Sequence, residues 1–245
     1  MIKELEDYSW FPETFRRFQA EFIGSFVQWF NIYRPLLPEI SQMLKSSRTG
    51  SVQDLCSGSG LPAIYIQRQL NEKYQLSLSD KYPPVSFKNQ ATLNYLAQST
   101  DLLVFEPTSD SLYTMFNSFH HFSPIEQQVI IRKMVMAKSS FIIAEILEPG
   151  IFNGLKIFFT TTILQLMLTP FVQPFSLQRL LFTYLIPVNL ITVTYDGIIS
   201  VVKSATLQQY RKRFEKEGHK EFEVSVHKIC NWKGGIIYIK GIAVR

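Results

Sequence analysis

The nine residues Val52-Gln53-Asp54-Leu55-Cys56-Ser57-Gly58-Ser59-Gly60 decide the fold. They begin in a short predicted strand, 51–55. A helix-like segment, 62–70, follows the glycines, and its proline suits the first turn of a helix. Strand, glycine-rich turn and helix in this order form a nucleotide-binding βα turn, because glycine lets the backbone approach a ligand closely. The stretch therefore predicts an α/β protein.

Asp54, at the end of this first strand, indicates which nucleotide is bound. Gly58-x-Gly60-x-x-Ala63, with Asp80 about twenty residues later, also satisfies the dinucleotide fingerprint. A dinucleotide would place a pyrophosphate beside Asp54, and like charges at close range repel. S-adenosylmethionine presents an ammonium and a sulfonium, which a carboxylate attracts. Asp54 therefore favours S-adenosylmethionine, and the alternatives are a nicotinamide dinucleotide or a tight turn with an incidental acid.

The stretch resembles the first motif of the class I S-adenosylmethionine-dependent methyltransferases, acid-x-Gly-x-Gly-x-Gly. Cys56 stands where the first glycine of that motif usually falls. The resemblance covers roughly residues 45–147 and the terminal hairpin at 221–245. It implies a doubly wound, mostly parallel sheet of Rossmann-like type with a C-terminal antiparallel hairpin. It also places four residues around the amino-acid end of the donor: Asp54, Cys56, Gly58 and Gly60.

Three further residues are predicted to bind the donor. The resemblance implies that Asp80, which ends the second strand, holds the ribose hydroxyls. It implies that Asp101, after the third strand, lies near the adenine, with Glu106 and Asp110 as competitors. Asn117 follows the fourth strand, and in open α/β sheets the ligand lies at the carboxyl ends of the strands.

Two adjacent histidines, His120 and His121, follow the same strand and are the candidate catalytic residues. Histidine has the ordinary pKa that suits proton transfer near neutral pH. The string Phe-Asn-Ser-Phe-His-His-Phe also resembles the fourth-strand motif of small-molecule methyltransferases. The competing interpretation is that one histidine caps the helix at Pro124 or packs in the core. No metal site is expected, because adjacent side chains diverge and a third ligand is not evident.

Glu145 lies within the fifth predicted strand, Phe-Ile-Ile-Ala-Glu-Ile-Leu. A charge in a covered strand is costly unless it is paired. Two interpretations are open: Glu145 belongs to the rim of the active site, or it forms a structural pair with an arginine.

Alternating strands and helices followed by a hairpin indicate an open α/β sheet. Strands are predicted at 51–55, 76–79, 92–96, 112–116, 140–147, 221–230 and 236–244. After the N-terminal segment, helices are predicted at 62–70, 85–90, 124–138, 196–205 and 207–216. We expect four segments: N-terminal helices (1–45), a donor-binding core (46–149), an apolar helical cap (150–200) and a C-terminal helix with the hairpin (201–245).

The segment 150–195 is nearly free of charge, with only Lys156 and Arg179. Its longest uncharged run, 157–178, is just long enough to span a bilayer at about 20 residues, but prolines, threonines and glutamines interrupt it. The favoured hypothesis is a helical lid with an apolar underside. A lid that also dips into a membrane surface and a transmembrane span are the alternatives. Both lid hypotheses predict an apolar or aromatic acceptor.

Composition limits the class of protein. The 245 residues are 46% hydrophobic and 18% charged, which is typical of a packed globular chain rather than a disordered one. Two cysteines make no disulfide framework, and the N-terminus lacks the pattern of a signal peptide. The chain carries a net charge of +5, and bases outnumber acids after Lys203. Interleaved acids make a solvated helix the favoured explanation of that excess.

These patterns predict a cytoplasmic methyltransferase that uses S-adenosylmethionine and a small, apolar or aromatic acceptor, with peripheral membrane contact through 150–195 as an open alternative. The first alternative is a non-enzymatic membrane-surface or lipid-binding protein with the same fold. The others are a nicotinamide-dependent oxidoreductase and a nucleic-acid methyltransferase. Nucleic acid is not the expected partner, because Asn117-Ser118-Phe119-His120 lacks the Asn/Asp-Pro-Pro-aromatic string and the insertion is apolar. The oligomeric state is not predicted.

Overall fold

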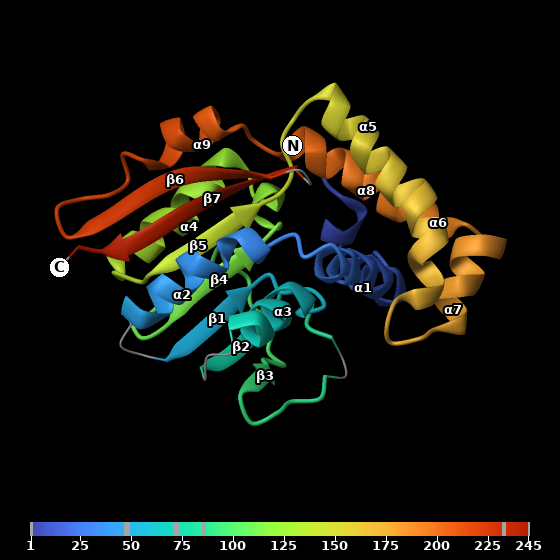
Figure 1. Ribbon diagram of the computed structural model, residues 1–245, viewed down its shortest axis with the longest axis horizontal. Helices are drawn as coiled ribbons and strands as arrows, with labels where there is room; N and C mark the ends of the chain where they lie inside the picture. Colours follow the sequence, from blue (N-terminus) through green and yellow to red (C-terminus); the bar gives the residue numbers. More distant parts are fainter. Residues whose placement is uncertain (1, 47–49, 71–73, 85–86, 232–233, 245) are drawn as a thin grey trace.

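The computed structural model describes residues 2–46, 50–70, 74–84, 87–231 and 234–244. These residues form a seven-stranded sheet in the order β3-β2-β1-β4-β5-β7-β6 (Figure 1). The strands are β1 (Ser51–Leu55), β2 (Gln75–Ser79), β3 (Leu93–Tyr95), β4 (Leu112–Phe116), β5 (Phe141–Glu145), β6 (Phe222–Asn231) and β7 (Gly234–Ala243).

The first five strands are parallel, and β7 runs against them. β1 pairs in parallel with both β2 and β4, whereas β7 runs antiparallel to β5 and to β6. Every residue of β4 and β5 is buried, as expected for central strands covered on both faces. The predicted fold, a doubly wound sheet with a C-terminal antiparallel hairpin, is confirmed.

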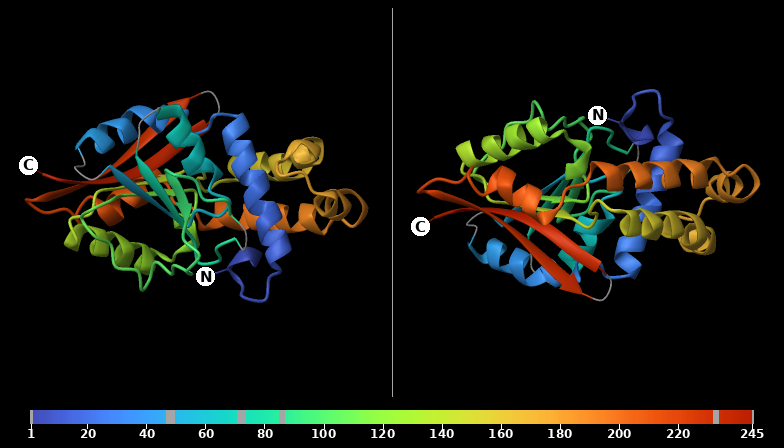
Figure 2. Two further views of the ribbon diagram at one scale, coloured as in Figure 1. Left: turned by 90° about the horizontal axis from the view of Figure 1, so that it is seen from below. Right: turned by 90° about the horizontal axis from the view of Figure 1, so that it is seen from above.

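Helices cover both faces of the sheet (Figure 2). α2 (Leu37–Ser46) and α3 (Leu61–Leu70) lie on one face, and α4 (Pro124–Met136) and α9 (Leu207–Phe214) on the other. Each face has its own apolar cluster. The predicted helix at 85–90 is wrong where the structure describes it, because residues 87–90 are extended. Residues 85–86 lie outside the described part.

Helix α1 (Glu13–Trp29) crosses the carboxyl edge of the sheet and touches the glycine-rich loop. Gly24 makes the contact possible, because a Cβ atom there would lie 2.5 Å from the hydroxyl oxygen of Ser59. The same atom would lie 2.8 Å from Cβ of Leu61, the first residue of α3. Helix α1 therefore packs closely on the loop, with the backbone of Gly24 against Ser59 and Leu61.

The apolar segment, residues 151–203, forms an arm that extends past the carboxyl edge of the sheet (Figure 1). It contains α5 (Ile151–Phe159), a π-helical turn (Thr160–Leu164), α6 (Gln165–Leu168), α7 (Leu177–Leu180) and α8 (Val188–Lys203). The helical stretch Ile151–Phe171 is long and apolar enough to cross a membrane, and little of it is buried. Most of the large side chains that the arm presents are apolar and exposed.

Candidate functional site

The glycine-rich loop joins β1 to α3 at the carboxyl edge of the sheet. Cys56, Gly58 and Gly60 all adopt left-handed backbone, with φ of 53°, 52° and 74°. A Cβ atom on Gly60 would lie 2.5 Å from Cδ1 of Leu78, so this position has neither the conformation nor the space for a side chain. Left-handed backbone costs an L-residue about 1–2 kcal/mol, which explains why glycine usually occupies the position of Cys56.

Asp80, directly after β2, supports the loop. Its Oδ2 accepts a hydrogen bond from the Gly58 N–H at 2.9 Å, and its Oδ1 accepts one from the Tyr82 N–H at 2.8 Å. The hydroxyl of Tyr95 on β3 donates to the Gly58 carbonyl at 2.9 Å. Gly58 is therefore held from two sides, with Asp80 beside the loop.

Asp54 is buried at the end of β1, where Thr114 on β4 donates a 2.6 Å hydrogen bond to its Oδ1. Burial raises the pKa of Asp54 to about 7, although the hydrogen bonds from Thr114 and Ser57 lower it. The nearby Tyr33 hydroxyl is buried and has no hydrogen-bond partner in the described part of the chain. Burial, Glu145 and Asp54 together raise the pKa of Tyr33. The buried carboxyl of Asp54 and the unpartnered hydroxyl of Tyr33 therefore lie near each other.

Asp101 contacts the segment that follows β2. It accepts a 2.8 Å hydrogen bond from Nζ of Lys81, in the segment that follows β2. Glu106 pairs instead with Lys133 of α4 at 2.9 Å, and Asp110 lies in an exposed turn before β4. The contact with Lys81 therefore distinguishes Asp101 from the other two acids.

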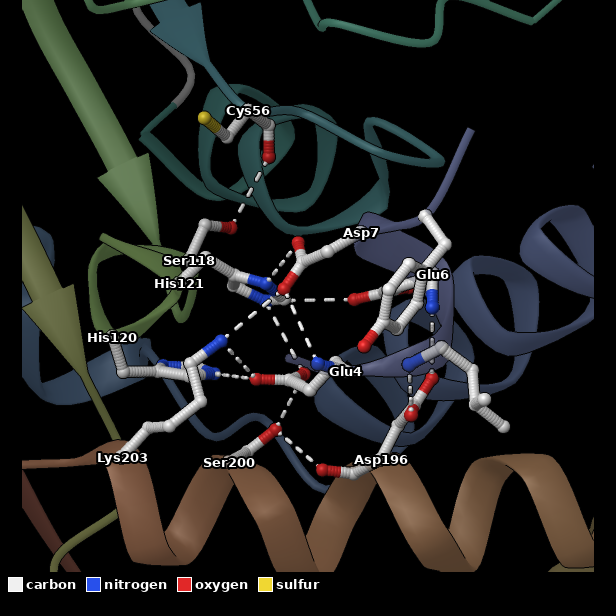
Figure 3. A network of polar contacts seen from close by, with 12 residues as sticks. Glu4, Glu6, Asp7, Cys56, Ser118, His120, His121, Asp196, Ser200 and Lys203 are labelled. Carbon is white, nitrogen blue, oxygen red and sulfur yellow. Dashed lines mark hydrogen bonds and ion pairs between the residues drawn. The ribbon is translucent and has the colours of Figure 1, made fainter. Parts of the chain in front are cut away.

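Asn117 connects the ends of the two central strands. Its N–H donates to the Ala144 carbonyl at 2.7 Å, and its Oδ1 accepts from the Ile146 N–H at 3.5 Å. The next residue, Ser118, donates from its hydroxyl to the Cys56 carbonyl at 3.3 Å (Figure 3). The segment after β4 is thereby tied to the glycine-rich loop.

His120 is buried and paired with Glu145. Its Nδ1 lies 2.6 Å from Oε2 of Glu145, whose Oε1 accepts a 2.6 Å hydrogen bond from the Phe119 N–H. The hypothesis that Glu145 pairs with an arginine is therefore wrong. The hypothesis that a histidine caps α4 is also wrong, because Ser123 is the N-cap and forms a reciprocal capping box with Glu126.

His121 lies among carboxylates of the N-terminal segment (Figure 3). Its Nδ1 is 2.9 Å from Oδ1 of Asp7, and its Nε2 is 3.5 Å from an oxygen of Glu4 and from one of Glu6. Burial lowers the pKa of His121, but the three carboxylates outweigh burial and raise it to about 10. His121 is therefore protonated near neutral pH and cannot accept a proton there.

The N-terminal acids and α8 complete this cluster, and sequence analysis missed them. Glu4 is buried and accepts hydrogen bonds from Ser200 at 2.8 Å and Lys203 at 2.9 Å. Asp196 accepts from the N–H of Leu5 at 2.6 Å. Asp196 thereby holds the short 3-10 turn Leu5–Asp7 against α8.

The expected divergence of the two histidine side chains is wrong. The rings of His120 and His121 lie 4.6 Å apart between centroids and are inclined by only 32°. Both turn toward Glu4, which supplies a third candidate ligand atom within 4.8 Å of the others.

The chain resembles known proteins in structure and not in sequence. No protein-family model matches the sequence, and no curated protein matches it. Among solved structures, TnmH shares 12% identity with a TM-score of 0.50 over 89% of this chain and 56% of its own. This likeness shows the fold alone, which is a Rossmann-like sheet of the methyltransferase type.

Two further matches have lower scores. Human N-acetylserotonin methyltransferase, solved in complex with S-adenosylmethionine, shares 12% identity over 89% of this chain and 54% of its own, with a TM-score of 0.48. The mitomycin 7-O-methyltransferase MmcR shares 13% identity over 85% and 54%, with a TM-score of 0.45. This chain spans about half the length of these structures. In its methyltransferase fold, the glycine-rich loop and the histidine pair lie at the same edge of the sheet.

Proposed function

We propose that the chain is an S-adenosylmethionine-dependent methyltransferase that acts on a small, apolar or aromatic acceptor. One observation carries the proposal: the edge that holds the Gly58 loop also holds the buried His120–Glu145 pair. A donor-binding loop and a candidate base meet where an open α/β sheet binds its ligand. When bound, S-adenosylmethionine supplies an electrophilic methyl group on a sulfonium.

The residues at the loop fit this donor better than they fit a dinucleotide. Burial opposes the ionisation of Asp54. The donor's ammonium would stabilise the ionised carboxylate, whereas the negative charge of a pyrophosphate would destabilise it. The unpartnered Tyr33 hydroxyl offers a further polar contact in the same region. Asp80 and Asp101 are proposed to hold the ribose and the adenine. Cys56, Gly60 and Asn117 shape the loop around them.

His120 is the proposed base. Glu145 orients its ring through Nδ1, which leaves Nε2 to accept a proton from the acceptor. His121 lacks that capacity near neutral pH because neighbouring carboxylates keep it protonated. Positioning of the acceptor in line with the methyl group supplies the rest of the catalysis.

The arm is proposed to bring this cytoplasmic enzyme to a lipid surface, where an apolar acceptor dissolves. Arg179 of α7 is buried, so the exposed part of the arm carries almost no charge. A contiguous apolar surface of this kind marks an interaction site. Its most exposed large side chains are Ile151, Phe152, Phe171, Leu177 and Leu185.

Calorimetric titration tests donor binding. We expect micromolar binding of S-adenosylmethionine and S-adenosylhomocysteine, and no binding of NAD. Asp54→Ala should weaken binding at least tenfold, whereas the matched control Asp110→Ala, in an exposed turn, should not change it. If a folded sample binds neither sulfur nucleotide, the enzyme proposal fails and the lipid-binding alternative takes its place.

Co-sedimentation with phosphatidylcholine vesicles tests the arm. The double variant F152S/L177S should lose binding, because both side chains are exposed on the arm. The control I125S/M136S removes two equally exposed apolar side chains from α4, away from the arm, and should keep it. Equal vesicle binding by the two variants contradicts the lipid contact. The lipid contact is also contradicted if light scattering shows that the wild type is a dimer and that F152S/L177S is a monomer, because the arm then binds a second copy of the chain.

A further inference from the structure

Glu4 lies between the two histidines at distances that no hydrogen bond explains. Its Oε1 is 3.8 Å from Nε2 of His120, and its Oε2 is 3.5 Å from Nε2 of His121. Both distances exceed those of protein hydrogen bonds. Glu4 and His120 are each only 1% exposed, so bulk water does not separate these atoms. A buried carboxylate and two imidazoles thus converge without touching (Figure 3).

Both rings are oriented as metal-binding histidines are. A ligating histidine usually donates its other N–H to a carboxylate, which fixes the ring and leaves the second nitrogen for the metal. Here Nδ1 of His120 is held by Glu145 at 2.6 Å, and Nδ1 of His121 by Asp7 at 2.9 Å. Each Nε2 is therefore turned toward Glu4, with a different carboxylate behind each ring.

We propose that Glu4, His120 and His121 bind a divalent transition-metal ion, with zinc as the best match. Two imidazoles and one carboxylate are the protein ligands of a class of zinc sites with an open fourth position. Ligand atoms bound to a tetrahedral zinc ion lie about 3.4 Å from one another. The two separations that involve Glu4, 3.5 and 3.8 Å, are close to that value, and all three ligand atoms lie within 4.8 Å of one another.

Glu6 and the side chains of α8 define the surroundings of this site. Oε1 of Glu6 lies 3.5 Å from Nε2 of His121, close enough to serve as a fourth ligand. Lys203 is the internal competitor, because its Nζ lies 2.9 Å from the Glu4 carboxylate and 3.2 Å from Asp7. The metal would balance the same carboxylates that Lys203 and protonated His121 balance without it.

This inference does not rest on donor binding, because none of its ligands belongs to the glycine-rich loop. It does change the role of His120 when metal is bound, from a base to a ligand. The ion would then also link the N-terminal turn to the segment after β4 and thereby close this side of the site.

The test is titration of the chelator-treated full chain with Zn²⁺ alone and with Co²⁺ alone. We expect one equivalent to bind, with the visible absorption of tetrahedral Co²⁺ and a rise in melting temperature with Zn²⁺. Glu4→Gln and His121→Gln should each weaken Zn²⁺ binding at least tenfold, whereas the control His227→Gln, on β6, should not. Lys203→Met should tighten it, because the competing ammonium is gone.

Circular dichroism of each metal-free variant shows whether it is folded, so that lost binding is not mistaken for unfolding. Binding that survives both Glu4→Gln and His121→Gln overturns the proposal. A folded wild-type protein that takes up less than about a tenth of an equivalent also overturns it. The latter result would mean that protons and Lys203 alone balance the cluster.

Discussion

The Nδ1 atom of His120 lies 2.6 Å from Oε2 of Glu145, and both side chains are buried. Glu145 ends β5, and its other oxygen accepts a hydrogen bond from the Phe119 N–H. One carboxylate therefore satisfies a ring nitrogen and a backbone donor that burial would otherwise leave unpaired. This relationship connects the stability of the sheet edge to the orientation of the proposed base.

Glu145→Ala should lower the free energy of unfolding by about 3 kcal/mol, because two buried groups lose their partner. The melting temperature should fall by about 6–12 °C, measured by circular dichroism. Glu145→Gln keeps an acceptor for the Phe119 N–H, so the melting temperature of this variant should fall by about half as much. Glu106→Ala removes an exposed acid and serves as the control. Equal melting temperatures for Glu145→Ala and Glu106→Ala would contradict the account.

Asp54→Asn should stabilise the donor-free protein at pH 8 but not at pH 4. Burial raises the pKa of Asp54 to about 7, so the folded protein holds a proton that the unfolded chain releases. Stability is therefore lost as the pH rises from the ordinary value of an aspartate to about 7, and the loss is complete above it. The amide removes this loss, worth about 4 kcal/mol at pH 8.

Urea unfolding of Asp54→Asn and wild type at the two pH values measures this difference. The variant should also lose donor affinity, so that stability and binding change in opposite directions. A variant less stable than wild type at pH 8 would show that Asp54 is ionised in the folded protein without cost.

The two glycines of the loop should differ in their tolerance of alanine. Gly60→Ala should cost about 3 kcal/mol, because it combines backbone strain with a Cβ atom 2.5 Å from Leu78. Gly58→Ala should cost about 1 kcal/mol from strain alone, since its Cβ would meet only Ala20 at 3.6 Å. Urea unfolding checks the order of the two, and the reverse order would refute it.

Arg179 should be needed to hold the arm in place. It is 1% exposed, pairs with Glu21 of α1 and donates to the carbonyl of Pro174. Arg179→Met leaves Glu21 with only the half-exposed Arg17 as a counter-charge, at 3.7 Å, which costs about 3 kcal/mol. Limited proteolysis should then cleave the arm faster than in wild type. The double variant E21Q/R179M should recover part of the resistance; no recovery would mean that the pair is not the cause.

The sheet was largely predictable from the sequence, because its signals are local. Strands 51–55 and 112–116 were predicted to the residue, since a glycine-rich turn follows the first and the polar residues Asn117 and Ser118 follow the second. Parallel strands in α/β folds also align their carboxyl ends, which brought Asp54, Asp80 and His120 to one edge. Where the weak helix at 85–90 was expected, the described residues instead form an extended connection.

The cluster around Glu4 could not be predicted in this way. Its contacts join residues far apart in the chain, such as Glu4 with Lys203 and His121 with Asp7. Periodicity and short motifs carry no information on such pairs, because tertiary packing decides them. Acids near an N-terminus and a lysine at a helix end are ordinarily solvated, so nothing in the sequence marked these as buried.

Hydrogen–deuterium exchange in the presence of S-adenosylhomocysteine tests the central claim most directly. It reports where on the chain the nucleotide binds, with NAD as the control. We predict slower exchange in the loop at 55–61 and in the segment after β2, at 80–82, with S-adenosylhomocysteine and not with NAD. Unchanged exchange at both segments in a folded sample, at saturating S-adenosylhomocysteine, would contradict the account of this edge as a methyl-donor site.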